Sequence, residues 1–324
     1  MTPPNAPRPA DEAARSGWSE QLAVRIAWCY YHLGLTQQEI AARLGINRIR
    51  VNRLLGEARR RGIVRISIDS KLVENAELEA RLIDRYRLDF AEVMLTMSDD
   101  ETTTSEVLGA AACQGVGAKL ANGMTIGVGW GVTLKSFAEA MPATPLAGSA
   151  VVAMLGSLSR RSSIDRYEAS TTLAGKLGAE CFYMPGPLFC DTEEARNALI
   201  VQPMVQEVLN RARRCDVAIV SIGGLGSETM RRVDFVSDEE VAAVQAAGAV
   251  GNYLGHYIDA GGDVLDHPLN RRVIGLEPHE LAGVPQRIMI SGGRSKVPGL
   301  KAVLGAGQLT GLVTDQASAR ALLD

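Results

Sequence analysis

Residues 36–61 read TQQEIAARLGINRIRVNRLLGEARRR, a stretch that predicts two short helices joined by a tight turn. Thr36 is suited to cap the first helix, because Glu39 follows it at the spacing of a capping box. Gly45 supplies a left-handed residue to end that helix, and Asn47 is suited to cap the second. Apolar residues then recur at helical spacing, which indicates a helix-turn-helix with a buried face made of Ile40, Ala41, Leu44, Val51, Leu54, Leu55 and Ala58.

The second helix turns arginine and asparagine side chains away from this apolar face. Guanidinium and carboxamide groups can make bidentate hydrogen bonds to base edges, and Ile49 is placed to touch a thymine methyl. We therefore expect the second helix to lie in the major groove of duplex DNA. The alternative is a helical hairpin whose charged face is only solvated. The residues expected to contact DNA are Thr36, Gln37, Asn47, Arg48, Ile49, Arg50, Asn52, Arg53 and Arg60.

Charge is divided unevenly along the chain. Residues 1–65 contain 11 basic residues, all arginine, and 5 acidic ones, which gives a net charge of +6. Residues 66–324 contain 23 basic and 32 acidic residues, a net charge of −9. A basic segment attached to an acidic remainder is typical of a head that binds a polyanion. We therefore expect double-stranded operator DNA to be the partner of the head.

Length and composition limit the remaining possibilities. A chain of 324 residues that is 46% hydrophobic and 22% charged is long enough for more than one globular domain. No apolar run approaches the ~18 residues of a membrane helix. The first 17 residues lack the apolar core of a signal peptide. We expect a cytoplasmic protein with no membrane partner. Five scattered cysteines and four histidines show no metal-ligand spacing, which predicts reduced thiols, no metal and no catalytic residue.

The pattern predicts four segments: a disordered lead-in over 1–17, an all-α helix-turn-helix domain over 18–68, a linker helix over 69–89 and an α/β domain over 90–324. The head begins with a helix over 19–32 and ends in a candidate wing strand over 63–68. From about residue 90, apolar strands alternate with amphipathic helices, which predicts a mostly parallel sheet covered on both faces. We expect strands at 92–96, 125–129, 150–155, 217–222, 273–276, 287–290 and 311–314, and helices at 104–120, 133–140, 170–177, 192–198, 202–211, 238–247 and 297–304.

Three expected strands end in glycine-rich loops, GVGWGVTL (127–134), SIGGLGS (221–227) and SGGRSK (291–296). Ligands bind at the carboxyl ends of parallel strands, and glycines allow close approach of the backbone to a ligand. Backbone amides at the start of a helix can bind an anion, and Lys296 would add positive charge to such a site. None of these loops has the spacing of a dinucleotide or triphosphate site. Trp130 is either a packing anchor or a stacking surface, and 167–168 either line the pocket or simply start a helix.

The order of these motifs, with the blocks 251–281, 291–307 and 312–323, resembles the SorC family of bacterial sugar-responsive transcriptional regulators from about residue 19 to the C-terminus. The resemblance implies a DNA-binding head joined to an effector domain related in fold to sugar-phosphate isomerases and glucosamine-phosphate deaminases. It also implies a tetramer and an effector that is a sugar phosphate, a sugar or a polyol.

By position, the resemblance implies that Thr133 and Lys296 contact the effector and that Arg231, or its neighbour Arg232, binds a phosphate. Asn252 stands where the family usually has Asp or Glu. An amide donates as well as accepts, so the effector's hydroxyl pattern or charge is expected to differ. The residues expected to contact the effector are Gly129, Trp130, Gly131, Val132, Thr133, Leu134, Gly223, Gly224, Leu225, Arg231, Asn252, Gly293 and Lys296.

Two classes of function remain open. The leading hypothesis is a regulator of a carbohydrate or polyol catabolic operon, active as a homodimer or homotetramer without a cofactor, whose DNA affinity depends on the bound effector. The alternative is a sugar-phosphate isomerase or deaminase with a basic N-terminal extension, which would need a positioned general base. The glycine loops offer hydroxyls and cations but no acid pair, so we expect no enzymatic activity. A purely structural DNA-associated protein would leave the glycine-lined strand ends unexplained.

Overall fold

The computed structural model describes residues 21–31, 33–61, 63–64, 70–95, 100–157, 168–225 and 236–324. They form two compact units that divide between Asp69 and Ser70. The expected lead-in over 1–17 lies outside the described residues, as do positions 65–68 of the expected wing. Residues 63–64 form a bend.

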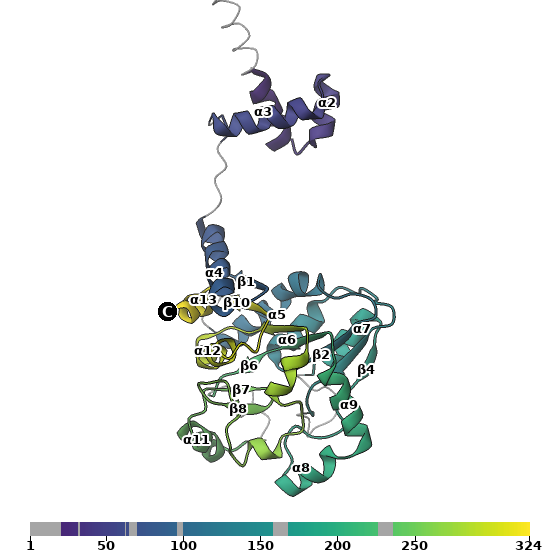
Figure 1. Ribbon diagram of the computed structural model, residues 1–324, viewed down its shortest axis with the longest axis vertical. Helices are drawn as coiled ribbons and strands as arrows, with labels where there is room; N and C mark the ends of the chain where they lie inside the picture. Colours follow the sequence, from purple (N-terminus) through teal and green to yellow (C-terminus); the bar gives the residue numbers. More distant parts are fainter. Residues whose placement is uncertain are drawn as a thin grey trace, which may run out of the picture. The chain divides into compact units, whose positions relative to one another are not determined.

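The first unit contains a helix over residues 21–31, α2 (Gln37–Leu44) and α3 (Arg48–Arg60) (Figure 1). The predicted capping box is confirmed: the Glu39 N–H donates to the Thr36 hydroxyl over 3.3 Å, and the Thr36 N–H donates to the Glu39 carboxylate over 2.7 Å. The Thr36 hydroxyl also donates to the Glu39 carboxylate, and this bond, together with the one from the Thr36 N–H, holds the pKa of Glu39 below its usual value. Gly45 ends α2 with a φ of 63°, and the Asn47 side chain accepts the Arg50 N–H over 2.8 Å.

The core of the first unit is the predicted apolar face. Val51, Leu54, Leu55 and Ala58 of α3 are at most 2% exposed. They pack in one cluster with apolar residues of the 21–31 helix and of α2, including Ile26 and Ile40. This packing fixes the rotation of α3 about its own axis and therefore decides which of its side chains face outward.

The second unit is built on a parallel sheet of seven strands in the order β1-β10-β9-β5-β2-β3-β4. Of these strands, β1, β10, β2 and β4 are labelled in Figure 1. The β2, β5 and β9 strands are neighbours, so the three glycine loops that follow them leave the sheet at one edge. The strands are β1 (Phe90–Met94), β2 (Thr125–Val128), β3 (Ala150–Ala153), β4 (Glu180–Phe182), β5 (Val217–Val220), β9 (Gln286–Ile290) and β10 (Gly311–Asp315).

Apolar cores cover both faces of this sheet, as the sequence predicts. Along β5, Val217 and Ile219 point into one core, and Ala218 and Val220 into the other. The first core includes side chains of α5, α6 and α7, and the second those of α9, α12 and α13. The helices are α4 (Ser70–Tyr86), α5 (Glu101–Gly117), α6 (Val132–Ala140), α7 (Ser170–Leu177), α8 (Glu193–Ile200), α9 (Pro203–Arg213), α11 (Asp238–Ala246), α12 (Val297–Gly305) and α13 (Gln316–Leu323).

The α4 helix, expected as a linker, packs inside the second unit. Its Leu78 and Leu82 are at most 4% exposed and contribute to the core. The Arg85 guanidinium donates to the carbonyl of Leu323 over 2.6 Å, and the Tyr86 hydroxyl to that of Leu322 over 2.7 Å. These bonds tie α4 to α13 at the end of the chain.

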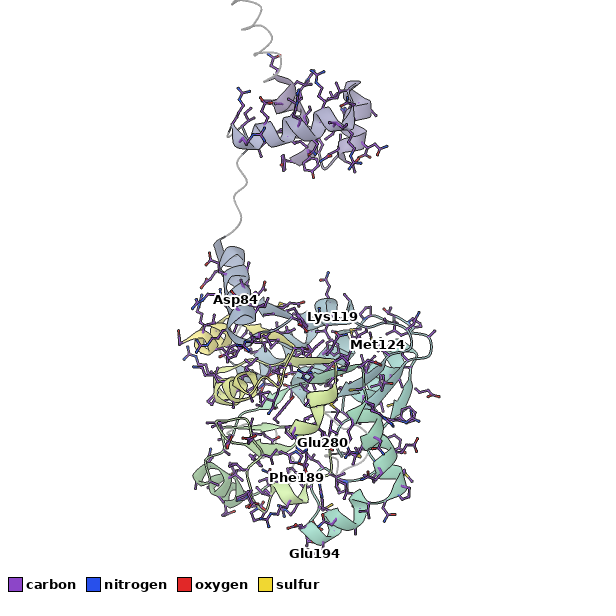
Figure 2. All side chains as sticks on the ribbon, in the orientation of Figure 1. Asp84, Lys119, Met124, Phe189, Glu194 and Glu280 are labelled. Atoms are coloured by element: carbon purple, nitrogen blue, oxygen red, sulfur yellow. The ribbon has the colours of Figure 1, made fainter. Side chains whose placement is uncertain are left out.

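One expected strand is wrong. The apolar residues 273–276 form only isolated bridges, from Val273 to Phe189 and from Gly275 to Leu155. All three side chains of Val273, Phe189 (labelled in Figure 2) and Leu155 are buried. A short buried run of this kind has the same apolar pattern whether or not it joins a sheet, because burial and not strand pairing determines its composition.

A small antiparallel sheet was not expected. It contains β6 (Ile222–Gly223), β7 (Gly251–Tyr253) and β8 (His256–Ile258), in that order. A two-residue turn joins β7 to β8, with φ of 50° at Leu254 and 79° at Gly255. Positive φ at both positions is typical of the tight turns that connect antiparallel strands.

Candidate functional site

The outward face of α3 carries the residues predicted to contact DNA. Thr36 and Asn47 are exposed at the starts of α2 and α3, and Gln37 is partly buried. Along α3, Ile49 is 81% exposed, so its side chain is accessible for contact with another molecule. The other expected contacts on α3 are all exposed: Arg48, Arg50, Asn52, Arg53 and Arg60.

Two exposed arginines of this face, Arg50 and Arg53, form no ion pair with another described residue. Within the described parts of the chain, no carboxylate lies within salt-bridge distance of Arg50 or Arg53, whereas Arg61 is 3.6 Å from Glu57. Guanidinium groups without an internal partner keep their donors available for phosphates or base edges. The geometry of the face therefore fits a helix that enters a DNA groove.

A cavity of about 500 Å³ opens at the carboxyl ends of β2, β3 and β4. This is the position at which open parallel sheets bind ligands. Its walls come from the ends of these three strands and the residues that follow them, from Lys135 and Glu139 of α6, and from the start of α7. They are Val128, Gly129, Trp130, Lys135, Glu139, Ala153, Leu155, Gly156, Ser157, Glu168, Ala169, Ser170, Thr171, Thr172, Tyr183 and Met184.

The first glycine loop lines this cavity through Gly129 and Trp130. Trp130 is partly buried and packs against the core, which is one of the two roles considered from the sequence, and it also lines the cavity. Gly131 has a φ of 123° at the start of α6, a conformation that L side chains rarely adopt. Behind it Val132 is partly buried, and Thr133 and Leu134 are buried outside the cavity lining.

The described part of the second glycine loop (221–225) touches the third loop, and neither of these segments contributes to the cavity lining. A Cβ built on Gly224 would come within 2.6 Å of the Ser295 hydroxyl oxygen. Gly223 pairs with Asn252 in the small sheet, and the partly buried Leu225 packs against the core. The two loops therefore form one packed surface beside the cavity.

Carboxylates of the chain itself already occupy the amides of the third loop. The Ser295 N–H donates to Glu101 over 2.8 Å, and its hydroxyl donates to the same carboxylate over 2.5 Å. The Gly293 N–H donates to Asp315 over 2.9 Å. An anion bound at these amides would have to displace those carboxylates.

Lys296 of this loop is also engaged. Its ammonium group donates to the Ser105 hydroxyl over 2.7 Å and so joins the loop to α5. Burial lowers the pKa of Lys296, while the carboxylates of Glu101 and Asp315 oppose that shift. The lysine is held by the protein and does not reach the cavity lining.

Asn252 is 6% exposed. It is the position at which the sequence differs from the Asp or Glu expected from the family resemblance. Its side-chain amide donates to the carbonyl of Gly255 over 3.0 Å, which closes the turn between β7 and β8. A carboxylate cannot make this bond, because an ionised carboxylate only accepts. Arg231 lies outside the described residues.

Several residues of the cavity lining were not predicted from the sequence. Lys135 and Glu139, one turn apart on α6, form an ion pair at 3.6 Å. Tyr183 is 66% exposed and follows β4, a strand of three residues that has too little pattern to be recognised. Glu168, which the sequence left undecided, lines the cavity and also binds the first amides of α7.

Two kinds of site are absent from the described residues. No group of three or more His, Cys, Asp or Glu side chains among them is arranged to hold a metal ion. No described helix combines the length and apolar composition needed to cross a membrane.

Comparison with known proteins gives the same division of the chain. Residues 70–324 match the family described as "Putative sugar-binding domain", and residues 20–80 match the Crp-like helix-turn-helix domain. The chain is 33% identical over 310 residues to the erythritol catabolism regulatory protein EryD of Brucella abortus (strain 2308), covering 94% of this chain and 96% of EryD. It is 31% identical over 326 residues to the transcriptional regulator LsrR of Enterobacter sp. (strain 638), covering 98% of each.

The fold matches a solved regulator over nearly its full length. The full-length sorbitol operon regulator SorC from Klebsiella pneumoniae superposes with a TM-score of 0.70 at 27% sequence identity, covering 94% of this chain and 99% of that one. The same pairing of a helix-turn-helix with a sugar-binding domain therefore recurs in sequence and in structure.

Proposed function

This chain belongs to the SorC family of bacterial sugar-binding transcriptional regulators, and from that premise we propose how its two units divide the work. The protein is a DNA-binding transcriptional regulator and not an enzyme. We propose that α3 reads an operator, with Thr36, Gln37, Asn47 and the exposed residues of α3 as its contacts. The effector, a sugar-type or polyol molecule, occupies the cavity beside Trp130 and changes the affinity of the head for DNA.

The cavity beside Trp130 carries this proposal. Its volume of about 500 Å³ lies within the usual range for small-molecule sites, roughly 300–1,000 Å³. It combines an indole ring with the hydroxyl-bearing side chains of Ser157, Thr171 and Thr172. An aromatic face packs on the C–H side of a polyol while hydroxyls exchange hydrogen bonds with its edge. The names of EryD and SorC refer to erythritol and sorbitol, two molecules of this chemistry.

Coupling between the units follows from linkage. An effector that binds two arrangements of the protein with different affinity shifts the population toward the one it prefers. Coupling free energies in such systems are about 1–3 kcal/mol, so the effector should change operator affinity by roughly 5- to 150-fold. The protein would act in the cytoplasm, where its operator lies, as a dimer or tetramer that presents paired heads.

The test measures binding of the full-length protein to DNA from the promoter region beside its gene, by fluorescence anisotropy, with and without erythritol, sorbitol and their phosphate esters. At least one of these probes should change operator affinity. Replacing Trp130 with Ala should remove that response while leaving effector-free operator binding unchanged.

Met204→Ala is the control for this variant, because Met204 is 66% exposed on α9 and lies outside the cavity lining. It should leave the response intact. Thermal unfolding of both variants separates loss of the cavity surface from loss of the fold. A full response in the Trp130 variant would place the effector elsewhere.

A further inference from the structure

The start of α7 is occupied by a carboxylate of the chain itself. Glu168 stands two residues before the helix, and its carboxylate accepts the N–H of Ser170 over 2.6 Å and the N–H of Thr171 over 3.1 Å. The hydroxyls of Ser170 and Thr171 donate to the same carboxylate. Four donors, about as many as a carboxylate accepts, therefore converge on Glu168. The amides that a phosphate would use at this wall of the cavity are already taken.

No unpaired cation among the described lining residues offsets this negative charge. Among the described lining residues, the charged side chains are Lys135, Glu139 and Glu168, whose net charge is −1. Lys135 is compensated by Glu139 at 3.6 Å. The rest of the lining supplies apolar surface, an indole ring and hydroxyl groups, all of which are uncharged.

We propose that Glu168 makes this cavity select an uncharged polyol and reject the phosphate ester of the same polyol. A phosphate monoester carries roughly −1.5 to −2 charges at neutral pH. Bringing it beside a carboxylate in a partly desolvated cavity sets like charges against each other. A repulsive group of this kind gives specificity without any new attractive contact. The inference rests on the proposed function, because it presumes that the effector binds in this cavity.

Glu101 provides a matched control within the same unit. Like Glu168, it is an acidic residue whose carboxylate accepts a backbone N–H and a hydroxyl, here both from Ser295. It acts at the loop after β9, two strands away from β2 in the sheet, and it does not line the cavity. Neutralising Glu101 changes the charge of the protein as much as neutralising Glu168, but not the charge of the cavity.

The experiment is isothermal titration calorimetry of the full-length protein with erythritol, sorbitol, erythritol 4-phosphate and sorbitol 6-phosphate. The unsubstituted protein should bind a free polyol at least about tenfold more tightly than its phosphate. Glu168→Gln should reduce this ratio about tenfold or more. Glu101→Gln should leave the ratio unchanged.

A second variant with the opposite expected sign keeps the proposal testable if Glu168→Gln fails to fold, which thermal unfolding would reveal. Lys135→Gln removes the only described cation of the lining and leaves Glu139 without its partner, so the preference for the free polyol should grow. Preference for the phosphate in the unsubstituted protein, an unchanged ratio in Glu168→Gln, or an unchanged ratio in Lys135→Gln would each overturn the proposal.

The outcomes also separate this inference from the proposed function. If both classes of probe bind and alter operator affinity but Glu168→Gln leaves their ratio unchanged, only the role of Glu168 is wrong. An equal change in Glu101→Gln would move the selecting charge to the loop after β9. If no probe binds while operator binding is intact, the ligand class assigned to the cavity is wrong and both proposals fall.

Discussion

Arg53 and Arg60 lie at positions of one helix from which we expect two different kinds of DNA contact. Both are exposed, but Arg60 is the last residue of α3, and Arg53 lies in its first half. The N-terminal part of a recognition helix usually contacts base edges, while its far end runs toward the phosphates. Arg53→Ala should therefore cost about 1–3 kcal/mol and relax the preference at one base pair. Fluorescence anisotropy with operators carrying single base changes measures both effects.

Arg60→Ala should instead weaken binding to all sequences by a similar factor and reduce the slope of log affinity against log salt by about 1. Arg81→Ala is the charge-matched control, because Arg81 is exposed on α4 in the other unit. It should change neither sequence preference nor the salt slope by as much. A uniform loss in both Arg53→Ala and Arg60→Ala would mean that Arg53 contacts phosphate and no base.

His256 should make the second unit less stable in mild acid. It is 2% exposed, and its ring nitrogen Nδ1 lies 2.9 Å from the carbonyl oxygen of Leu254. Burial lowers its pKa from 6.5 to about 4, partly offset by that hydrogen bond. The unfolded chain takes up a proton below pH 6.5 while the native protein does not, so the free energy of unfolding falls as pH decreases from 6.5 toward 4. The loss attributable to His256 at pH 5 should be about 2 kcal/mol.

Urea unfolding at pH 7.5 and pH 5 measures this effect as a difference between proteins. In His256→Asn, the decrease in unfolding free energy between the two pH values should be about 2 kcal/mol smaller than in the unsubstituted protein. His279→Asn is the control, because the His279 side chain is 74% exposed. If His256→Asn shows the unsubstituted decrease, the native protein takes up the proton at His256 near its ordinary pKa.

At the scale of the element, the sequence predicted those pieces that carry a local signal. The helix predicted at 170–177 has these bounds in the structure, and both hydrogen bonds of the capping box predicted at Thr36 are present. The hairpin of β7 and β8 was missed because its turn contains Leu254, a residue type that rarely takes a positive φ. An Asn-Gly pair at the same place would have predicted it.

The candidate site was predicted in part for a similar reason. The loop after β2 was recognised by its glycines, and Gly129 and Trp130 do line the cavity. Lys135 and Tyr183 carry no distinctive motif, and only the order of β2, β3 and β4 in the sheet brings them together. Strand order depends on packing between distant segments, which periodicity along one chain does not record.

The contact between α5 and α6 should transmit changes directly to the cavity. A Cβ on Gly109 of α5 would lie 2.1 Å from the carbonyl oxygen of Thr133 and 3.0 Å from the backbone nitrogen of Phe137. Gly109→Ala must therefore push α6 away, at a cost of about 1–3 kcal/mol in stability. Because α6 begins two residues after Trp130, effector affinity should fall as well. Thermal unfolding and calorimetry with the bound polyol measure the two effects.

Gly175→Ala is the control for this helix contact. Gly175 lies in α7, and a Cβ there would meet nothing within 4 Å. Alanine in a helix is favoured over glycine by about 0.5–1 kcal/mol, so this variant should be as stable as the unsubstituted protein or slightly more so. Equal stability of the Gly109 and Gly175 variants would show that α5 and α6 are less closely packed than these distances require.

Across the whole molecule, the distribution of charge restricts where DNA binds. Residues 1–65 carry a net charge of +6 and residues 66–324 a net charge of −9. The acidic segment repels a polyanion at low ionic strength, while the basic one attracts it. We therefore expect the second unit to raise DNA affinity by bringing heads together and not by touching the phosphates itself.

The full-length protein should consequently be an oligomer that binds its operator far more tightly than a fragment of residues 1–69. Linking two heads makes the second binding event intramolecular, which raises affinity by about 10²- to 10⁴-fold. The fragment should also show a smaller salt slope, because one head contacts fewer phosphates than two. Light scattering gives the oligomeric state, and anisotropy at several salt concentrations gives both slopes.

Full-length Arg53→Ala is the control for the oligomeric state. It should weaken the DNA contacts and still remain an oligomer, because the substitution lies in the head and leaves the second unit unchanged. A monomeric full-length protein, or a fragment with equal affinity and slope, would mean that a single head accounts for operator binding.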